Sequence, residues 1–315
     1  MAADYKVTNP MNWVRSKLQS RKPAPLGSRR SKLAYYLLSA PALLLSLSII
    51  FIPFLLTIFV AFTDWNGISR EFNWVGTSNF QELAGDRIFW LAVTNNIKWT
   101  IMFVTIPVVV GLFAAVLLFT LKHGRSLYQV AFLIPFILAP ITNAILWLNV
   151  MFSPTSGLIG YLNKIGFDIS VPLGNTKLAL FAVAGVDMWH YWGFLTVIYL
   201  AALRQTPVEQ IEAGVIEGAS AYQVFRHIYL PNIKPTLQLM FVIIIIYSFL
   251  TFDYIYLITW GGPAHSTEML STYAYTFAFS MFQVGKAAAV SLVMGLFGAV
   301  SAFLYVWLSR KDIME

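Results

Sequence analysis

The sequence predicts an all-α polytopic membrane protein with six transmembrane helices. Of its 315 residues, 58% are hydrophobic and only 11% are charged, whereas a soluble domain is about 45–50% apolar and about 25% charged. The mean hydropathy is +0.69. Charged side chains gather between long apolar runs, so most of the chain is expected to face lipid. This composition excludes a water-soluble globular protein.

Six apolar stretches are long enough to cross a bilayer. A helix rises 1.5 Å per residue, and a hydrocarbon core of about 30 Å therefore needs about 20 mostly apolar residues. Prolines lie within several stretches, so kinked helices packed as a bundle are expected. The predicted spans are 34–63, 95–121, 127–152, 178–203, 235–259 and 287–308.

The first span follows a basic arm, residues 1–33. That span is too long and begins too late for a signal peptide, so we interpret it as a retained helix. The arm is either a tail that binds lipid headgroups or an amphipathic helix around residues 10–20, and the composition of 20–32 favours a tail there. The expected organisation is the arm, then the first helix with its outer loop over 34–94, then a core of five helices over 95–310.

The distribution of lysine and arginine predicts the orientation. The segments on the N-terminal side of the membrane carry 15 of the 21 basic residues, and the opposite loops carry five. By the positive-inside rule, both termini are therefore cytoplasmic. The net charge of +7 fits this asymmetry and anionic headgroups, and does not indicate nucleic-acid binding.

Residue types that support catalysis are sparse. There is no cysteine and no Gly-rich phosphate-binding loop, so the chain cannot supply a nucleotide site of that kind. The histidines (His123, His190, His227 and His265) lack the spacing and neighbouring carboxylates that zinc or hydrolytic chemistry requires. We therefore expect no metal site, no bound cofactor and no enzymatic activity.

The loop between the fourth and fifth spans, residues 204–234, is far longer than the usual 2–8 residues. Thr206 and Pro207 predict a helix start, with Glu209 in the first turn. Gly218 and Ser220 predict a break before a second short helix. Small residues between these points would let a partner approach the backbone. Length alone leaves a docking element and a plain connector equally open.

The loop resembles the EAA loop of ATP-binding-cassette importer permeases, in the pattern Glu212-Ala213-Gly214, Gly218 and Ile228-x-Leu230-Pro231. Gly214 stands where the family has alanine. Further segments are similar to sugar permeases of the maltose type, so that the resemblance extends from about residue 35 to 310. Those segments are Phe62-Thr63-Asp64-Trp65-Asn66, Trp74-Val75-Gly76-x-x-Asn79-Phe80, Phe252-Asp253 and Gly261-Gly262-Pro263.

The resemblance implies a permease of the prokaryotic plasma (inner) membrane that imports a sugar by alternating access. It implies four kinds of partner: a second homologous permease, two ATPase subunits that carry ATP and Mg, an extracytoplasmic sugar-binding protein, and membrane lipid. The loop would then contain the coupling helix that docks on the ATPase. The implied coupling residues are Glu212, Ala213, Gly214, Gly218, Ala219, Ile228, Leu230 and Pro231.

Two ionisable residues, Asp187 and His190, lie in the middle of the fourth span. Such residues are functional candidates because lipid disfavours them, although a buried Asp–His hydrogen bond would be a structural explanation. Aromatic rings interleave with them, as in sugar sites, but also as in packing and interfacial belts. The resemblance places the sugar pocket on Asp187, His190, Tyr191, Phe194, Tyr247, Ser248 and Thr251, with apolar Ile244 where the maltose case is polar.

Two alternative functions remain at this point. In an ion-coupled secondary transporter, Asp187, His190 or Asp253 would carry protons. Such a protein would show inverted repeats, which are not evident. A membrane enzyme would need catalytic groups clustered at one depth, and only the Asp187–His190 pair approaches that.

Overall fold

The computed structural model describes residues 29–314, and within that range the chain forms helices, loops and an isolated β-bridge between Thr63 and Trp74. The contacts divide it into two units, Met1–Leu56 and Thr57–Glu315. In the first unit, α2 (Arg29–Ser46) continues into the π-turn η1 (Leu47–Phe51) and the start of α3 (Ile52–Val60). The tail predicted over 20–32 is therefore wrong from Arg29 onwards, where good helix formers extend the helix. The possible helix around 10–20 lies outside the described residues.

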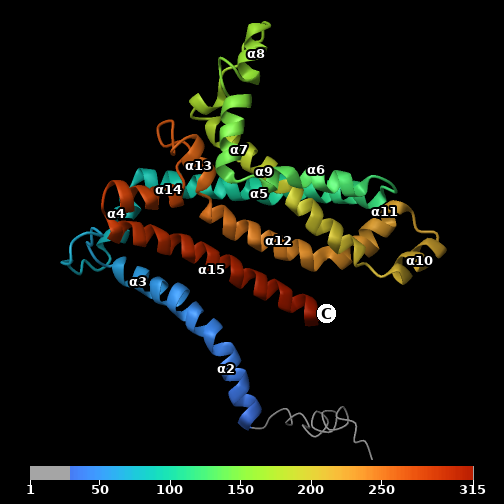
Figure 1. Ribbon diagram of the computed structural model, residues 1–315, viewed down its shortest axis with the longest axis horizontal. Helices are drawn as coiled ribbons and strands as arrows, with labels where there is room; N and C mark the ends of the chain where they lie inside the picture. Colours follow the sequence, from blue (N-terminus) through green and yellow to red (C-terminus); the bar gives the residue numbers. More distant parts are fainter. Residues whose placement is uncertain (1–28, 315) are drawn as a thin grey trace, which may run out of the picture. The chain divides into compact units, whose positions relative to one another are not determined.

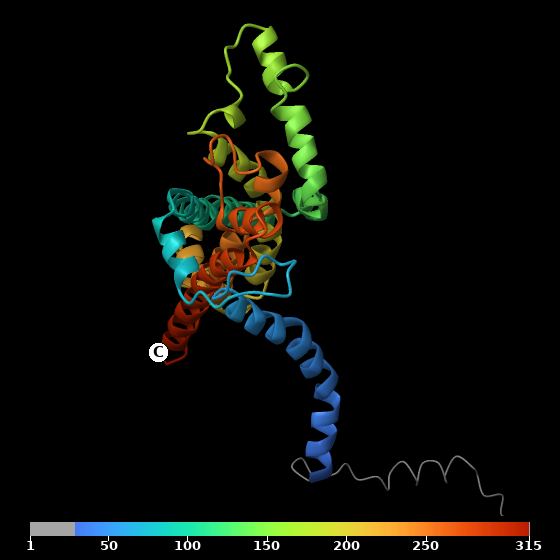
Figure 2. The same cartoon turned by 90° about the vertical axis from the view of Figure 1, so that its left-hand side faces the viewer.

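The second unit holds the remaining helices, and Figure 1 labels most of them. A long extension, which ends in α8, leaves the bundle of α5, α9 and α12 (Figures 1 and 2). The elements are α4 (Ser78–Gly85), α5 (Arg87–Thr120), α6 (Arg125–Ile137), α7 (Pro140–Leu146), η2 (Trp147–Met151), α8 (Leu158–Lys164), η3 (Pro172–Gly174), α9 (Ala179–Arg204), α10 (Val208–Ile216), α11 (Ala221–Val224), η4 (Phe225–Tyr229), α12 (Leu230–Leu250), α13 (Asp253–Ile258), α14 (Leu270–Tyr275), η5 (Thr276–Ser280) and α15 (Val284–Met314).

By length and composition, four helices in the described range can cross a membrane: Tyr35–Val60, Arg87–Thr120, Ala221–Ile258 and Val284–Phe303. A bent pair, Arg125–Ile137 with Pro140–Met151, makes a fifth if it counts as one span. The predicted fourth span is present as the 26-residue helix α9, but the polar residues at its centre lower its mean hydropathy. The membrane-spanning helical fold is thus confirmed, while the number six stays a prediction.

The predicted spans differ from the helices chiefly at their ends and breaks. Helix α5 begins at Arg87, before the predicted residue 95, because the Asp86 carboxylate accepts the Ile88 N–H at 2.8 Å and caps it. The predicted span 127–152 is bent by 94° between α6 and α7, where Pro140 opens the second helix. The predicted span 235–259 is interrupted between α12 and α13, at Thr251 and Phe252.

Helix α9 lies at the centre of the second unit and packs on α5, α6 and α12. Two glycines permit the closest approaches. A Cβ on Gly193 would lie 1.7 Å from the Phe132 carbonyl oxygen on α6, and a Cβ on Gly111 of α5 would lie 2.9 Å from the Leu195 Cβ on α9. Backbones therefore meet directly at these two points. The core around them is apolar and includes Trp99, Tyr199 and Ile244, all fully buried or nearly so.

The segment after α3 is held by the residues of two motifs noted in the sequence. The Asp64 carboxylate accepts the backbone N–H of Asn73 at 2.6 Å and its side-chain N–H at 2.9 Å. These hydrogen bonds lower the pKa of Asp64. The Asn79 amide donates to the carbonyls of Ala61 and Thr63, at 2.8 and 2.9 Å. The two motifs thus fold onto each other and fix the turn that leads to α4.

A second cluster of polar side chains joins α5 to residues 259–272. We call this segment, residues 259–272, the clasp. The Asn96 side chain is fully buried; it donates to the Ser248 carbonyl and accepts the Leu270 N–H, both at 2.9 Å. Asn95 donates to the Ser266 and Glu268 carbonyls at 3.0 and 2.9 Å. Buried amides that are fully hydrogen-bonded specify one arrangement of the chain. The clasp is therefore tied to α5 by side chains.

Candidate functional site

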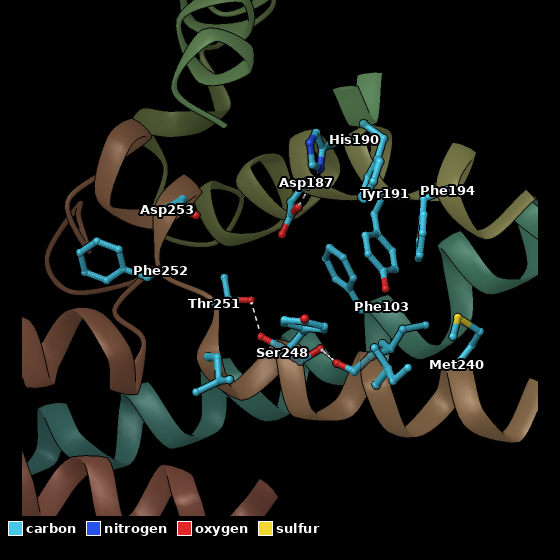
Figure 3. A pocket seen from close by; sticks show the side chains of 15 residues that line it. Phe103, Asp187, His190, Tyr191, Phe194, Met240, Ser248, Thr251, Phe252 and Asp253 are labelled. Carbon is cyan, nitrogen blue, oxygen red and sulfur yellow. Dashed lines mark hydrogen bonds and ion pairs between the residues drawn. The ribbon is translucent and has the colours of Figure 1, made fainter. Parts of the chain in front are cut away.

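The predicted pocket residues of α9 share one helical face. Asp187, His190, Tyr191 and Phe194 follow the spacing i, i+3, i+4, i+7, which places side chains on one side of a helix. On the other side of a cavity of about 460 Å³, α12 contributes Tyr247 and Ser248, and Thr251 follows its end. Figure 3 shows this arrangement. All seven residues named from the sequence therefore line the same cavity.

Aromatic rings form much of the cavity wall. Phe136 of α6 stacks on Phe194 with ring centroids 4.6 Å apart, and Tyr191 lies 6.1 Å from Phe103 of α5. Sequence reasoning missed Phe103 and Phe136, because nothing local indicates that α5 and α6 approach this face of α9. It also missed Met240 and Ile243, although the spacing of Met240, Ile243, Ile244 and Tyr247 on one face of α12 was a usable signal.

Asp187 and His190 do not form the hydrogen bond considered from the sequence. The His190 Nδ1 lies 4.0 Å from the Asp187 Oδ1, beyond hydrogen-bond distance. Both side chains are largely buried, with 13% of His190 and 17% of Asp187 exposed. Figure 3 shows the Asp187 carboxylate pointing away from α9 into the cavity. The hydrogen bond considered from the sequence is therefore not formed, although the two side chains lie within ion-pair distance, and the carboxylate faces the cavity.

The hydroxyl groups across the cavity are partly engaged. The Ser248 Oγ donates to the Ile244 carbonyl at 2.7 Å, and the Thr251 Oγ1 donates to the Tyr247 carbonyl at 3.2 Å. Each hydroxyl can still accept a hydrogen bond from a ligand. Together with the Asp187 carboxylate, they offer hydrogen-bond acceptors beside aromatic faces. Such a cavity suits a ligand with several hydroxyl donors and apolar C–H faces.

Six of the eight predicted coupling residues lie at the opposite end of α12, in the segment 204–229, which we call the loop helices; Leu230 and Pro231 begin α12 itself. Helix α10 begins at Val208 after Pro207, so Thr206 does not cap it as predicted; Thr206 is buried instead, and its hydroxyl has no partner among the described residues. Gly218 has a φ of +82°, which a residue with a Cβ rarely adopts. The predicted break between two short helices is therefore confirmed.

The loop helices are stabilised locally. Ser220 and Gln223 form a capping box, in which the Ser220 N–H donates to the Gln223 Oε1 at 2.7 Å. A Cβ on Gly214 would lie 2.8 Å from the Ile228 Cδ1, so the small residue allows α10 to lie close to η4. Glu212, Ala213, Gly218 and Pro231 are exposed, whereas Gly214, Ala219, Ile228 and Leu230 are half-buried.

Large apolar side chains of the loop helices face outward. Ile216 is 85% exposed, Tyr222 68% and Val215 61%. An apolar hollow of about 430 Å³, lined in part by Phe119, Val215 and Tyr229, lies beside them. Exposed apolar side chains grouped on one element are typical of a surface that a partner covers.

The remaining candidate chemistry is limited. Within residues 29–314, no group of three histidine, aspartate or glutamate side chains is placed to hold a metal ion. The prediction that His265 lacks a neighbouring carboxylate was wrong, because its Nδ1 lies 2.8 Å from the Glu268 Oε2. Glu268 is buried and also accepts the Thr272 hydroxyl at 2.7 Å. This pair belongs to the clasp and not to the cavity.

The comparisons with known proteins agree with this architecture. Residues 99–311 match the family model of the binding-protein-dependent transport system inner membrane component. A probable ABC transporter permease of Pyrococcus horikoshii is 34% identical and covers 84% of this chain and 92% of its own. The probable starch degradation products transport system permease AmyD of Thermoanaerobacterium thermosulfurigenes is 31% identical and covers 89% of this chain and 95% of its own.

A solved structure shares the fold. It is that of a bacterial alginate ABC transporter in complex with an alginate pentasaccharide-bound periplasmic protein, with a TM-score of 0.78, 21% identity, and coverage of 90% of this chain and 96% of that one. The family match spans well over half of the chain. This protein therefore belongs to the family of binding-protein-dependent transport system inner-membrane components, and is a transporter permease and not an enzyme.

Proposed function

We propose that this chain is the permease subunit of an ATP-driven importer that takes a sugar of the oligosaccharide or glycoside class from a binding protein. The observation that carries the proposal is the cavity between α9 and α12, where Asp187, Tyr247 and Thr251 stand beside stacked aromatic rings. That combination suits sugar hydroxyls and sugar C–H faces. The relative AmyD, whose name specifies starch degradation products, supports the same substrate class.

The proposal assigns the loop helices to the ATPase. Their exposed apolar side chains, Val215, Ile216 and Tyr222, would be covered by one of two ATPase subunits that bind ATP and Mg. The loop helices lead through η4 directly into α12, which lines the cavity. Movement of the ATPase would thus reach the cavity along one continuous segment. A second, homologous permease would complete the pathway, and both termini would be cytoplasmic, as the distribution of basic residues predicts.

The test is to co-express the chain with its second permease, ATPase and binding protein, and to measure ATPase activity in lipid nanodiscs with a sugar panel. We expect one sugar class to stimulate ATP hydrolysis in the presence of the binding protein. Glu212→Ala should reduce that stimulation at least about tenfold, since a transition-state effect of 1.4 kcal/mol suffices for a factor of ten.

Glu209→Ala is the matched control. Glu209 is an exposed carboxylate in the first turn of the same helix, outside the predicted coupling residues, and its removal should leave the stimulation nearly unchanged. If no ATPase co-purifies and uptake into proteoliposomes instead follows a proton or sodium gradient, the importer assignment is overturned and an ion-coupled transporter replaces it.

A further inference from the structure

The cavity between α9 and α12 has an unusual balance of charge for a ligand site. Two of its lining residues are carboxylic acids, Asp187 and Asp253, and none of the described residues that line it is a lysine or an arginine. Asp253 stands in the first turn of α13, directly after the break that ends α12. The carboxyl groups therefore come from two separate elements, α9 and α13.

Among the described residues that line the cavity, His190 is the one that could carry a positive charge. Its Nδ1 lies 4.0 Å from the Asp187 Oδ1, so that carboxylate would neutralise a protonated imidazole. Its ring packs between aromatic neighbours, with centroids 5.3 Å from Phe136 and 5.8 Å from Tyr254. His190 is therefore poorly placed to act as the counter-ion of a ligand anion.

This arrangement of carboxyl groups should favour the binding of hydroxyl groups and disfavour the binding of anions. A carboxylate accepts hydrogen bonds from the hydroxyl groups of a sugar. A sugar carboxylate or phosphate in the same place would lose its water without gaining a cationic partner, and would face like charges. Building an unpaired charge against the wrong ligand is a general route to specificity.

We propose that this cavity selects its substrate by charge, accepting saccharides that carry no anionic group and rejecting uronates and sugar phosphates. The inference rests on the proposed function, since it concerns the same cavity, and it narrows the substrate class. Asp187 and Asp253 are the residues that carry the discrimination, and the stacked rings of Phe136 and Phe194 hold the sugar without regard to its charge.

The experiment measures direct binding to the assembled transporter, both permeases with their ATPases, by saturation-transfer NMR without the binding protein, so that the binding protein's own preference does not enter. The ligands are a matched pair of one backbone and one length: an oligogalacturonate and the same oligosaccharide after its carboxylates are reduced to primary alcohols. The neutral member should bind at least about tenfold more tightly than the acid, as expected when like charges are brought together without a cationic partner.

Variants then assign the discrimination to residues. Asp187→Asn and Asp253→Asn keep the side-chain shape and should each reduce the preference for the neutral sugar at least about threefold. Asp168→Asn removes one negative charge at an exposed position outside the cavity, and should leave the preference unchanged. A preference that survives both cavity variants overturns the assignment to these carboxyl groups.

Different results would overturn the charge selection and the sugar cavity. Binding of the acid within about threefold of the neutral sugar overturns the charge selection and leaves the sugar importer standing. Binding of neither sugar, by a transporter that still hydrolyses ATP, overturns the sugar cavity itself, and the charge selection with it.

Discussion

The clasp and the loop helices lie at opposite ends of α12 and are built on different principles. In the clasp, buried side chains bind backbone groups of distant segments: Asn96 alone links α5 to Ser248 and Leu270. In the loop helices, the capping box of Ser220 and Gln223 is local, the longer-range hydrogen bond from the Asn232 amide to the Gln210 Oε1 at 2.9 Å joins two exposed side chains, and apolar side chains such as Ile216 stay exposed. The clasp is held by contacts within this chain, whereas the loop helices present an apolar surface typical of one that a partner covers.

The largest expected effect on stability follows from removing a side chain that ties α5 to the clasp. Asn96→Leu leaves the Leu270 N–H and the Ser248 carbonyl buried without partners, and two such groups should reduce the free energy of unfolding by about 3 kcal/mol. The measurement is the thermal unfolding midpoint of the purified complex in detergent. Thr94→Val, an exposed position on the same helix, is the control; equal shifts for both variants would contradict the role given to the clasp.

A smaller effect is expected in the loop helices. Ser220→Ala removes one half of the capping box and should weaken that short helix by about 1 kcal/mol. Because the capping box links only neighbouring residues, the midpoint of global unfolding should hardly move. Amide hydrogen exchange over 221–225 should instead accelerate about fivefold, the factor that corresponds to about 1 kcal/mol.

Ser291→Ala serves as the control for that exchange experiment, because the Ser291 hydroxyl donates to the Ala287 carbonyl within α15, away from the loop helices. A clear fall in the unfolding midpoint for Ser220→Ala would show that the loop helices are coupled to the core as strongly as the clasp is. The comparison between the two ends of α12 would then fail.

The smallest expected effect concerns an exposed ion pair. The Lys286 Nζ lies 2.6 Å from the Glu82 Oε2, and this hydrogen bond lowers the pKa of Glu82 from 4.5. A carboxylate whose pKa is lower in the folded state stabilises the fold above its unfolded pKa, and this contribution is lost as the pH falls through the folded value.

Glu82→Gln should therefore be less stable than the parent at pH 7, by well under 1 kcal/mol because Glu82 is 55% exposed. The difference should shrink as the pH falls below 4.5. Unfolding midpoints of the two proteins across this range are the measurement. A stability difference that grows on acidification contradicts the sign.

The helices of this fold are predictable from the sequence because each is a long apolar run, but two breaks show the limit. Pro140 gave a local signal for the bend between α6 and α7. At Thr251 and Phe252 there is no proline or glycine; there the Ser271 hydroxyl donates to the Thr251 carbonyl that the helix leaves free. Such a break depends on a contact twenty residues away and is invisible to local patterns.

The site divides in the same way. Asp187, His190, Tyr191 and Phe194 could be grouped from one helix, because their spacing alone puts them on one face. Asp253 was noted as part of a segment similar to sugar permeases and as a candidate proton carrier, but not as a pocket residue. Phe136 was not noted at all, since its place beside Phe194 depends on how α6 packs on α9. The chemistry carried by one element was predictable, and the chemistry assembled from several was not.

The close backbone contacts at Gly193 and Gly111 have a mechanical consequence. With no side chain between the backbones, neither α6 nor α5 can slide along α9 without a steric clash at these points, so the three helices should behave as one rigid body. Helix α12 contains no glycine, so it meets this body with side chains in between, and side chains can change rotamer. We expect a conformational change that opens or closes the cavity to move α12 relative to α5, α6 and α9, which stay in place with respect to one another.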